Sequence, residues 1–195
     1  MSEIIESVSE RLQAAQARIS DAARVAGRAP GSIRLIAVSK TFPADDIAAL
    51  LAAGQRDFGE SYLQEAEAKI ETLGDAGVVW HFIGPIQSNK TRAIAEHFDW
   101  VHSIERTKIA ERLATQRPAR LPPLDVCLQV NVSGEATKSG VSPDDVPALA
   151  RAIKALDRLR LRGLMAIPEP TDDIGLQRAR FRLLRELRDR IAAEV

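Results

Sequence analysis

The run IRLIAVSK at residues 33–40, followed by TFPADDIAALLA at 41–52, decides how this chain folds. The first run is apolar, as in a buried strand, and the second has a proline at residue 43 and then apolar residues at helical spacing. A strand that leads directly into a helix is the start of an α/β fold. In such folds the loops after the strands form the ligand site, so Lys40 leaves the strand at the end where ligands bind.

The same alternation continues along the chain, after an opening helix whose apolar pattern ends before Gly27. Strands are predicted near 33–38, 56–58, 78–83, 99–102, 124–131 and 161–166, and helices near 44–53, 61–73, 88–96, 106–116, 143–155 and 173–193. Each helix crosses back over the sheet, so the strands run parallel, either in an open doubly wound sheet or in a (β/α) barrel. No dinucleotide fingerprint or phosphate loop occurs, which favours the barrel.

The composition predicts one globular domain. The chain has 195 residues, of which 45% are hydrophobic and 28% are charged. Its 27 basic and 27 acidic residues cancel, which argues against nucleic acid or an anionic membrane as a partner. Cys127 is the only cysteine, so an internal disulfide and a multi-cysteine metal site are excluded. With no apolar run near the roughly 20 residues of a membrane span, the expected location is the cytoplasm.

Lys40 is the candidate for covalent chemistry. A neutral lysine amine forms a Schiff base with a carbonyl ligand, and burial of a lysine against an apolar strand favours the neutral form. We therefore expect Lys40 to be partly buried. The alternative is that this lysine merely ends the strand and reaches water, and position alone does not separate the two.

Further polar residues follow or close other predicted strands. Ser61 follows the second strand, where it is able to cap the next helix. His81 lies within the third strand, either as a catalytic acid or base or as a hydrogen-bonded core histidine, and Ser88 or Asn89 opens the helix after it. Met165 lies in the sixth strand, where packing is the alternative to a ligand contact.

A polar loop follows the fifth predicted strand. Lys138 and Ser139 precede Gly140 there, and together they offer positive charge and backbone donors to an anion. A solvated loop without a ligand is the alternative.

Six runs of the chain carry a resemblance to a known family. They are AVSKT at 37–41, FGE at 58–60, WHFIGPIQSNK at 80–90, HSI at 102–104, KSG at 138–140 and RGLMAIP at 162–168. In order and spacing they closely resemble the pyridoxal 5′-phosphate (PLP) homeostasis proteins. The run at 80–90 is the most specific, and the resemblance extends from about the opening helix to the end of the chain.

The resemblance implies an α/β fold: a single TIM-type (β/α) barrel over residues 1–195, similar to the amino-terminal domain of alanine racemase and to other fold-type III PLP proteins. It implies PLP held as an internal aldimine on Lys40. The other cofactor-binding residues are expected to be Ser61, His81, Ser88, Asn89 and Met165. The implied function is that of a monomeric carrier that buffers PLP and delivers it to apo-enzymes.

The chain departs from the family pattern in three places. Ser61 stands where the family usually has asparagine, so a hydrogen bond is expected to be shorter in reach or lost. Phe42 stands where a second lysine is common, so cofactor exchange is expected to be weaker. Val195 ends the sequence after six strand-helix units, where the family continues with two more that clamp the phosphate. We therefore expect a barrel incomplete at its carboxyl end, because the sequence is a fragment or an incomplete gene product; if it is complete, much reduced PLP affinity is expected.

Two other functions stay open at this stage. The first is a PLP-dependent racemase or lyase, for which His81 and Tyr62 are the candidate acid–base residues and amino-acid α-proton exchange is the discriminating assay. The lack of a second, β-rich domain in this sequence argues against it. The second is a scaffold that has lost PLP binding, which would show no cofactor absorbance when folded.

Overall fold

The computed structural model describes residues 2–134 and 139–194. The chain divides into two compact units, Met1–His81 and Phe82–Val195. All six strands that the sequence predicts are present among the described residues, each followed by a helix. The expectation of one barrel domain over residues 1–195 stays a prediction.

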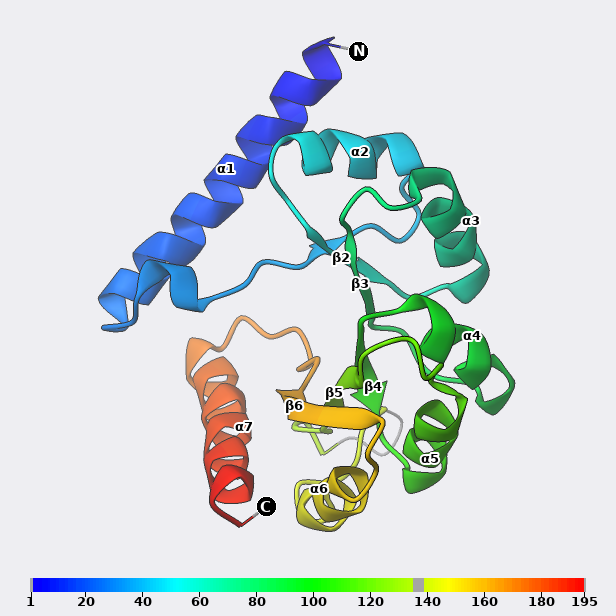
Figure 1. The fold of residues 1–195 in the computed structure, drawn as a ribbon. Helices are drawn as coiled ribbons and strands as arrows, with labels where there is room; N and C mark the ends of the chain where they lie inside the picture. Colours follow the sequence, from blue (N-terminus) through cyan, green and yellow to red (C-terminus); the bar gives the residue numbers. More distant parts are fainter. Residues whose placement is uncertain (1, 135–138, 195) are drawn as a thin grey trace. The chain divides into compact units, whose positions relative to one another are not determined.

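The first unit begins with a long helix and contains the first three strands (Figure 1). Its elements are α1 (Ser2–Val25), the 3-10 turn η1 (Pro30–Ser32), β1 (Ala37–Val38), α2 (Ala44–Ala52), β2 (Asp57–Glu60), α3 (Leu63–Leu73) and β3 (Val79–Phe82), whose last residue lies across the unit boundary. Strands β1 and β2 pair in parallel, with Ala37 opposite Phe58. The Val79 amide donates to the Arg56 carbonyl over 2.8 Å, which brings β3 alongside β2.

The second unit repeats the pattern (Figure 1). Its elements are η2 (Ser88–Lys90), α4 (Thr91–His97), β4 (Trp100–Ile104), α5 (Thr107–Gln116), β5 (Leu124–Gln129), α6 (Val146–Lys154), β6 (Leu159–Met165) and α7 (Ile174–Glu194). Strand β5 lies between β4 and β6 and pairs in parallel with both. Helices α5, α6 and α7 contact β6.

Strand β1 is shorter than predicted, and the expected start at residue 33 is wrong. Continued back from the pair of Ala37 and Phe58, the register places residues 33–35 opposite the turn before β2, which offers no strand to pair with. The Gln55 side chain replaces the missing ladder there, because its Nε2 donates to the Leu35 carbonyl over 2.9 Å and to the Asp57 carbonyl over 2.7 Å. A buried amide therefore satisfies backbone groups that strand pairing leaves open.

Each unit has its own apolar core. Phe58 and Ile47 are almost fully buried in the first unit, and the ring of Trp80 lies 6.4 Å from that of Phe58. In the second unit, Phe82 and Phe98 pack edge to face with ring centroids 5.2 Å apart. Burying each such side chain contributes about 1.5–3 kcal/mol, so these packed faces hold the strand ends in place.

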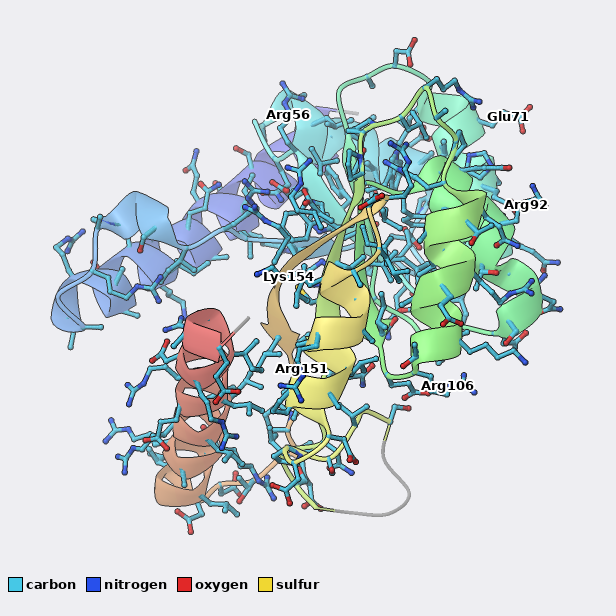
Figure 2. The ribbon with its side chains drawn as sticks, turned by 60° about the horizontal axis from the view of Figure 1, so that its bottom comes forward. Arg56, Glu71, Arg92, Arg106, Arg151 and Lys154 are labelled. Atoms are coloured by element: carbon cyan, nitrogen blue, oxygen red, sulfur yellow. The ribbon has the colours of Figure 1, made fainter. Side chains whose placement is uncertain are left out.

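The helix surfaces carry the charged residues. Arg151 and Lys154 lie in the last turn of α6 and are exposed, where their positive charges complement the helix dipole (Figure 2).

Among the described residues, no helix is both long and apolar enough to cross a membrane. Over the same ranges, no group of three or more His, Cys, Asp or Glu residues is placed to hold a metal ion.

Candidate functional site

Lys40 lies at the carboxyl end of β1, as the sequence predicts, but its side chain is exposed. The expectation of partial burial is therefore wrong. The ladder ends one residue earlier, where the Ser39 amide donates to the Gly59 carbonyl over 3.0 Å. The chain then turns, and the Phe42 amide donates back to the Ser39 carbonyl over 3.1 Å. Because Lys40 lies within this turn, its amine faces water and not the core.

A buried cluster of charges lies against this turn. Lys69, on α3, places its Nζ 2.8 Å from Glu60 Oε1 and 2.6 Å from Glu65 Oε1, and it donates to the Ser39 carbonyl over 2.8 Å. The Ser39 hydroxyl donates to Glu60 Oε1 over 2.6 Å. We call Ser39, Glu60, Glu65 and Lys69 the buried ion cluster. One member, Ser39, directly precedes Lys40, and Glu60 and Lys69 bind its hydroxyl and its carbonyl.

The residue directly after Lys40 is also bound by this cluster. The Thr41 amide donates to Glu65 Oε1 over 2.5 Å. Thr41 has a φ of 68°, a left-handed conformation that a β-branched residue rarely adopts and that costs about 1–2 kcal/mol. The hydrogen bond to Glu65 helps to offset this strain, so both neighbours of Lys40 are held by the cluster: Thr41 by Glu65, and Ser39 by Glu60 and Lys69.

The cluster is almost dry on one side and open on the other. The side chains of Glu60 and Lys69 are 0% and 6% exposed, whereas that of Glu65 is 31% exposed. The hydrogen bond from Lys69, followed by the smaller effect of the Thr41 amide, lowers the pKa of Glu65 against the opposing effect of burial. Glu60 Oε2 is buried without a hydrogen-bond partner in the described part of the chain. One lysine between two carboxylates leaves the cluster with one net negative charge when all three are ionised.

Ser61 and Tyr62 follow directly after the cluster. Ser61 is half-buried, and helix α3 begins at Leu63 with Tyr62 as its N-cap residue and without a side-chain cap. The prediction that Ser61 caps this helix is therefore wrong, because the helix starts one residue too late for its hydroxyl to serve as the cap. Tyr62 and Phe42 are exposed, at 56% and 54%.

His81 is buried within β3, with 1% of its surface exposed. Its Nε2 lies 3.0 Å from Asp57 Oδ1, and Arg34 Nη1 lies 3.3 Å from the same oxygen. This contact matches the hydrogen-bonded core histidine that the sequence left open. A contact of His81 with a cofactor stays a prediction.

Ser88 and Asn89 lie in the 3-10 turn η2, which leads into α4. The carbonyl of Ser88 accepts from the Thr91 hydroxyl over 2.9 Å and from Arg112 Nε over 3.0 Å. Ser88 is half-buried and Asn89 is exposed. As predicted, this pair precedes the helix, and the backbone of Ser88 is fixed by contacts with two helices.

Met165 ends β6 and is half-buried. Its carbonyl accepts from the Val130 amide over 2.8 Å, which places it at the carboxyl end of the β5–β6 pair. In the loop after β5, the Gly140 amide donates to Glu105 Oε2 over 3.0 Å. Lys138, the predicted anion-binding residue of this loop, lies outside the described residues.

The sequence analysis missed Lys69. Its signal is present, because Leu63, Ala66 and Lys69 follow one another at a spacing of three residues on one face of α3, and all three are buried. A lysine on the apolar stripe of a helix, four residues after Glu65, indicates a buried partner. Glu60 stands out in the sequence only as part of the run FGE at 58–60, because nothing in the sequence shows that its carboxylate turns inward.

The chain matches known proteins over almost its whole length. The family described as alanine racemase, N-terminal domain, matches residues 11–195. The pyridoxal phosphate homeostasis protein of Pseudomonas aeruginosa is 63% identical over 180 residues, which cover 92% of this chain and 78% of that protein. Among solved structures, PipY of Synechococcus elongatus with PLP bound has a TM-score of 0.80 at 34% identity, covering 96% of this chain and 82% of that one.

A more distant match concerns the fold alone. Alanine racemase from Corynebacterium glutamicum has a TM-score of 0.66 at 15% identity, covering 96% of this chain and 51% of that one. Together with the family match, this confirms the predicted fold class, an α/β fold with six parallel strands like the amino-terminal barrel of alanine racemase.

Proposed function

Because this chain belongs to the pyridoxal phosphate homeostasis protein family, we propose that it binds PLP through the Lys40 amine and delivers the cofactor to enzymes that lack it. One observation supports this most directly: Lys40 is exposed at the carboxyl end of β1, on a backbone segment whose two neighbouring residues are held by buried charges. An accessible amine on a fixed backbone fits an aldehyde ligand.

The chemistry that PLP supplies is a reactive aldehyde on a phosphorylated ring. Lys40 would hold the cofactor through its amine, by a condensation with the aldehyde that releases water. The reaction is reversible, so a second amine can displace Lys40 and take the cofactor away. A carrier needs this reversibility, because it must hold the aldehyde and then release it to another protein.

The other predicted contacts belong to the same proposal. Ser61 follows β2, Ser88 and Asn89 lie in the turn before α4, and Met165 ends β6, so each lies at or after the end of a strand, the position that ligand-contacting residues take in this fold class. His81 is buried beside Asp57 within β3, and its predicted contact with the cofactor belongs to the same proposal.

A carrier, and not a racemase, is supported by the state of the acid–base candidates. Proton abstraction requires a base that the substrate can reach. The His81 ring is 1% exposed and lies 3.0 Å from the Asp57 carboxylate, so it is shielded from a substrate. Tyr62 is exposed, so this argument applies to His81 alone, and an assay of amino-acid α-proton exchange tests Tyr62.

The test is a titration of the protein with PLP, followed by absorbance near the visible band of a lysine imine, for the wild type and for Lys40→Ala. We expect the band in the wild type and its loss in Lys40→Ala. Lys108→Ala, which removes an exposed lysine of α5, is the matched control and is expected to keep the band. If Lys40→Ala keeps the band, as the control does, the assignment is overturned.

For delivery, the loaded protein is mixed with an apo-enzyme that depends on PLP. Delivery is supported if the activity of the enzyme recovers faster than with free PLP at the same free concentration.

A further inference from the structure

We propose that Lys69 is a positioning residue: through Glu65 and the Ser39 carbonyl it holds residues 39–41 in the one conformation that presents Lys40 to its ligand. This inference rests on the proposed function for the meaning of Lys40, but its geometry stands independently of any cofactor.

The contacts place Lys69 at the centre of the cluster. Its three ammonium hydrogens have three acceptors within 2.8 Å, namely Glu60 Oε1, Glu65 Oε1 and the Ser39 carbonyl. Two of these acceptors lead to the turn, the carbonyl directly and Glu65 Oε1 through the Thr41 amide. The residues on both sides of Lys40 therefore depend on one nitrogen atom.

Buried charges of this kind are a poor means of stabilising a fold. Removing a lysine and a carboxylate from water costs several kcal/mol, and well-packed apolar side chains in their place are often as stable. Leu63 and Ala66, the neighbours of Lys69 on the same face of α3, show that the helix packs with apolar residues there. What an apolar residue cannot do is bind a carbonyl and a carboxylate at once, so the function that fits Lys69 is to fix a conformation.

The conformation that needs fixing is that of Thr41. Without its hydrogen bond to Glu65, a β-branched residue at a φ of 68° returns to the extended or helical region. That rotation would redirect the backbone at Lys40 and move its amine away from the end of β1. The buried ion cluster therefore prevents a change that the local sequence favours.

The main experiment compares Glu65→Leu with Glu65→Gln. Glutamine keeps an oxygen that accepts from Thr41 and Lys69, whereas leucine removes it, and Glu65 is exposed enough for both variants to fold. Two readouts are measured: hydrogen exchange of the Thr41 amide in protein without cofactor, and the affinity of Lys40 for PLP. For Glu65→Leu we expect exchange at least about tenfold faster and affinity about tenfold weaker, the size of one charge-assisted hydrogen bond. Glu65→Gln should restore most of both.

A second variant tests Lys69 itself. The double variant Glu60→Gln, Lys69→Met removes one negative and one positive charge, so the net charge of the cluster is unchanged. Glu60 is then not left as a buried carboxylate without its lysine. We expect the urea midpoint of this variant to stay close to the wild-type value while Thr41 exchange accelerates and PLP affinity falls. Lys108→Met is the control and should change neither readout.

The outcomes are separable. Unchanged Thr41 exchange in Glu65→Leu and in the Glu60–Lys69 pair would overturn the positioning role. A loss of PLP affinity that a lower urea midpoint accounts for in full would also overturn the positioning role, because the cluster would then only stabilise the fold. If the wild type forms no adduct at Lys40, the proposed function fails, while the exchange of Thr41 still decides the positioning role.

Discussion

Within the described residues, Lys69 in the first unit and Arg117 in the second are the long basic side chains that are buried, and the two are bound in different ways. In the first unit, Lys69 is held by two carboxylates and one carbonyl. In the second, Arg117 donates to the carbonyls of Pro122, Ala95 and Phe98 over 2.7–2.8 Å, without a described hydrogen bond to a carboxylate. The first cation binds groups beside Lys40, and the second binds backbone where α4 and α5 end.

The difference separates two uses of a buried charge. Arg117 donates to carbonyls that the end of a helix leaves without partners, and these hydrogen bonds stabilise the fold. Burial lowers the pKa of Arg117, although a guanidinium remains charged at neutral pH. Lys69 binds two carboxylates and the Ser39 carbonyl, so its contacts lead to the segment that carries the Lys40 amine. We infer that Arg117 stiffens the second unit, whereas Lys69 positions the turn that carries Lys40 in the first.

The largest expected effect is on the arginine. Arg117→Met removes the side-chain donor from two buried carbonyls, those of Ala95 and Phe98, and from that of the exposed Pro122. It should lower the free energy of unfolding by about 3–5 kcal/mol, which urea unfolding measures. The folded fraction should still form the Lys40 adduct. Arg92→Met, at an exposed position of α4 (Figure 2), is the control and should change stability by less than about 0.5 kcal/mol. A change of stability below about 1 kcal/mol in Arg117→Met would remove the contrast between the two cations.

The second prediction concerns the loop after β5. A Cβ at Gly140 would lie 2.8 Å from the Asn131 nitrogen and 2.9 Å from the Val130 carbonyl carbon, and its φ is +112°. Gly140→Ala should therefore cost about 2–4 kcal/mol in urea unfolding. Gly54→Ala has a similar φ of +96° but open space around it, so it should cost only about 1–2 kcal/mol. Equal losses in the two variants would show that backbone packing does not fix this loop.

The third prediction tests the strain beside Lys40. Thr41→Gly removes the penalty of a left-handed β-branched residue, and glycine's greater freedom when unfolded offsets part of the gain. The expected result is a stability increase of about 0.5–1 kcal/mol in urea unfolding. In the Glu65→Leu background, the same change should recover part of the lost PLP affinity. A destabilised Thr41→Gly protein would contradict the account of the turn.

The smallest expected effect is a pH dependence that arises at Glu65. Its folded pKa lies below the ordinary value of 4.5, chiefly because Lys69 donates to it. A lowered folded pKa means that the stabilisation is fully present above pH 4.5 and is lost as the pH falls through the folded value. The difference in urea midpoint between the wild type and Glu65→Gln should be constant from pH 7 to about 5 and shrink below 4.5. A difference that stays constant into the acid range would refute this.

Much of the fold could be predicted from the sequence, because each βα unit is encoded by its own apolar pattern. The predicted strand at 99–102 and the predicted helix at 106–116 agree with β4 and α5 to within two residues. The predicted start of β1 failed because pairing is set by the partner strand, and β2 begins only at Asp57. A property of two segments cannot be read from one of them.

The candidate site was predictable in part for a similar reason. Lys40 could be placed at a strand end from its own run of sequence, and it lies there. The apolar stripe of α3 indicates that Lys69 is buried, but its pairing with Glu60 depends on how α3 packs beside β2, and no local pattern specifies that the Glu60 carboxylate turns inward. Ser88, Asn89 and Met165 lie near strand ends as expected, and their contacts with a cofactor stay predictions.

The most direct test of the central claim is reduction of the wild-type protein with borohydride in the presence of PLP, followed by peptide mass mapping. The account predicts a single reduced adduct on Lys40, formed at a rate that falls in Glu65→Leu and not in Lys108→Met. An adduct on another lysine, or none on folded protein, would contradict the claim that Lys40 is the residue the buried ion cluster presents to the cofactor.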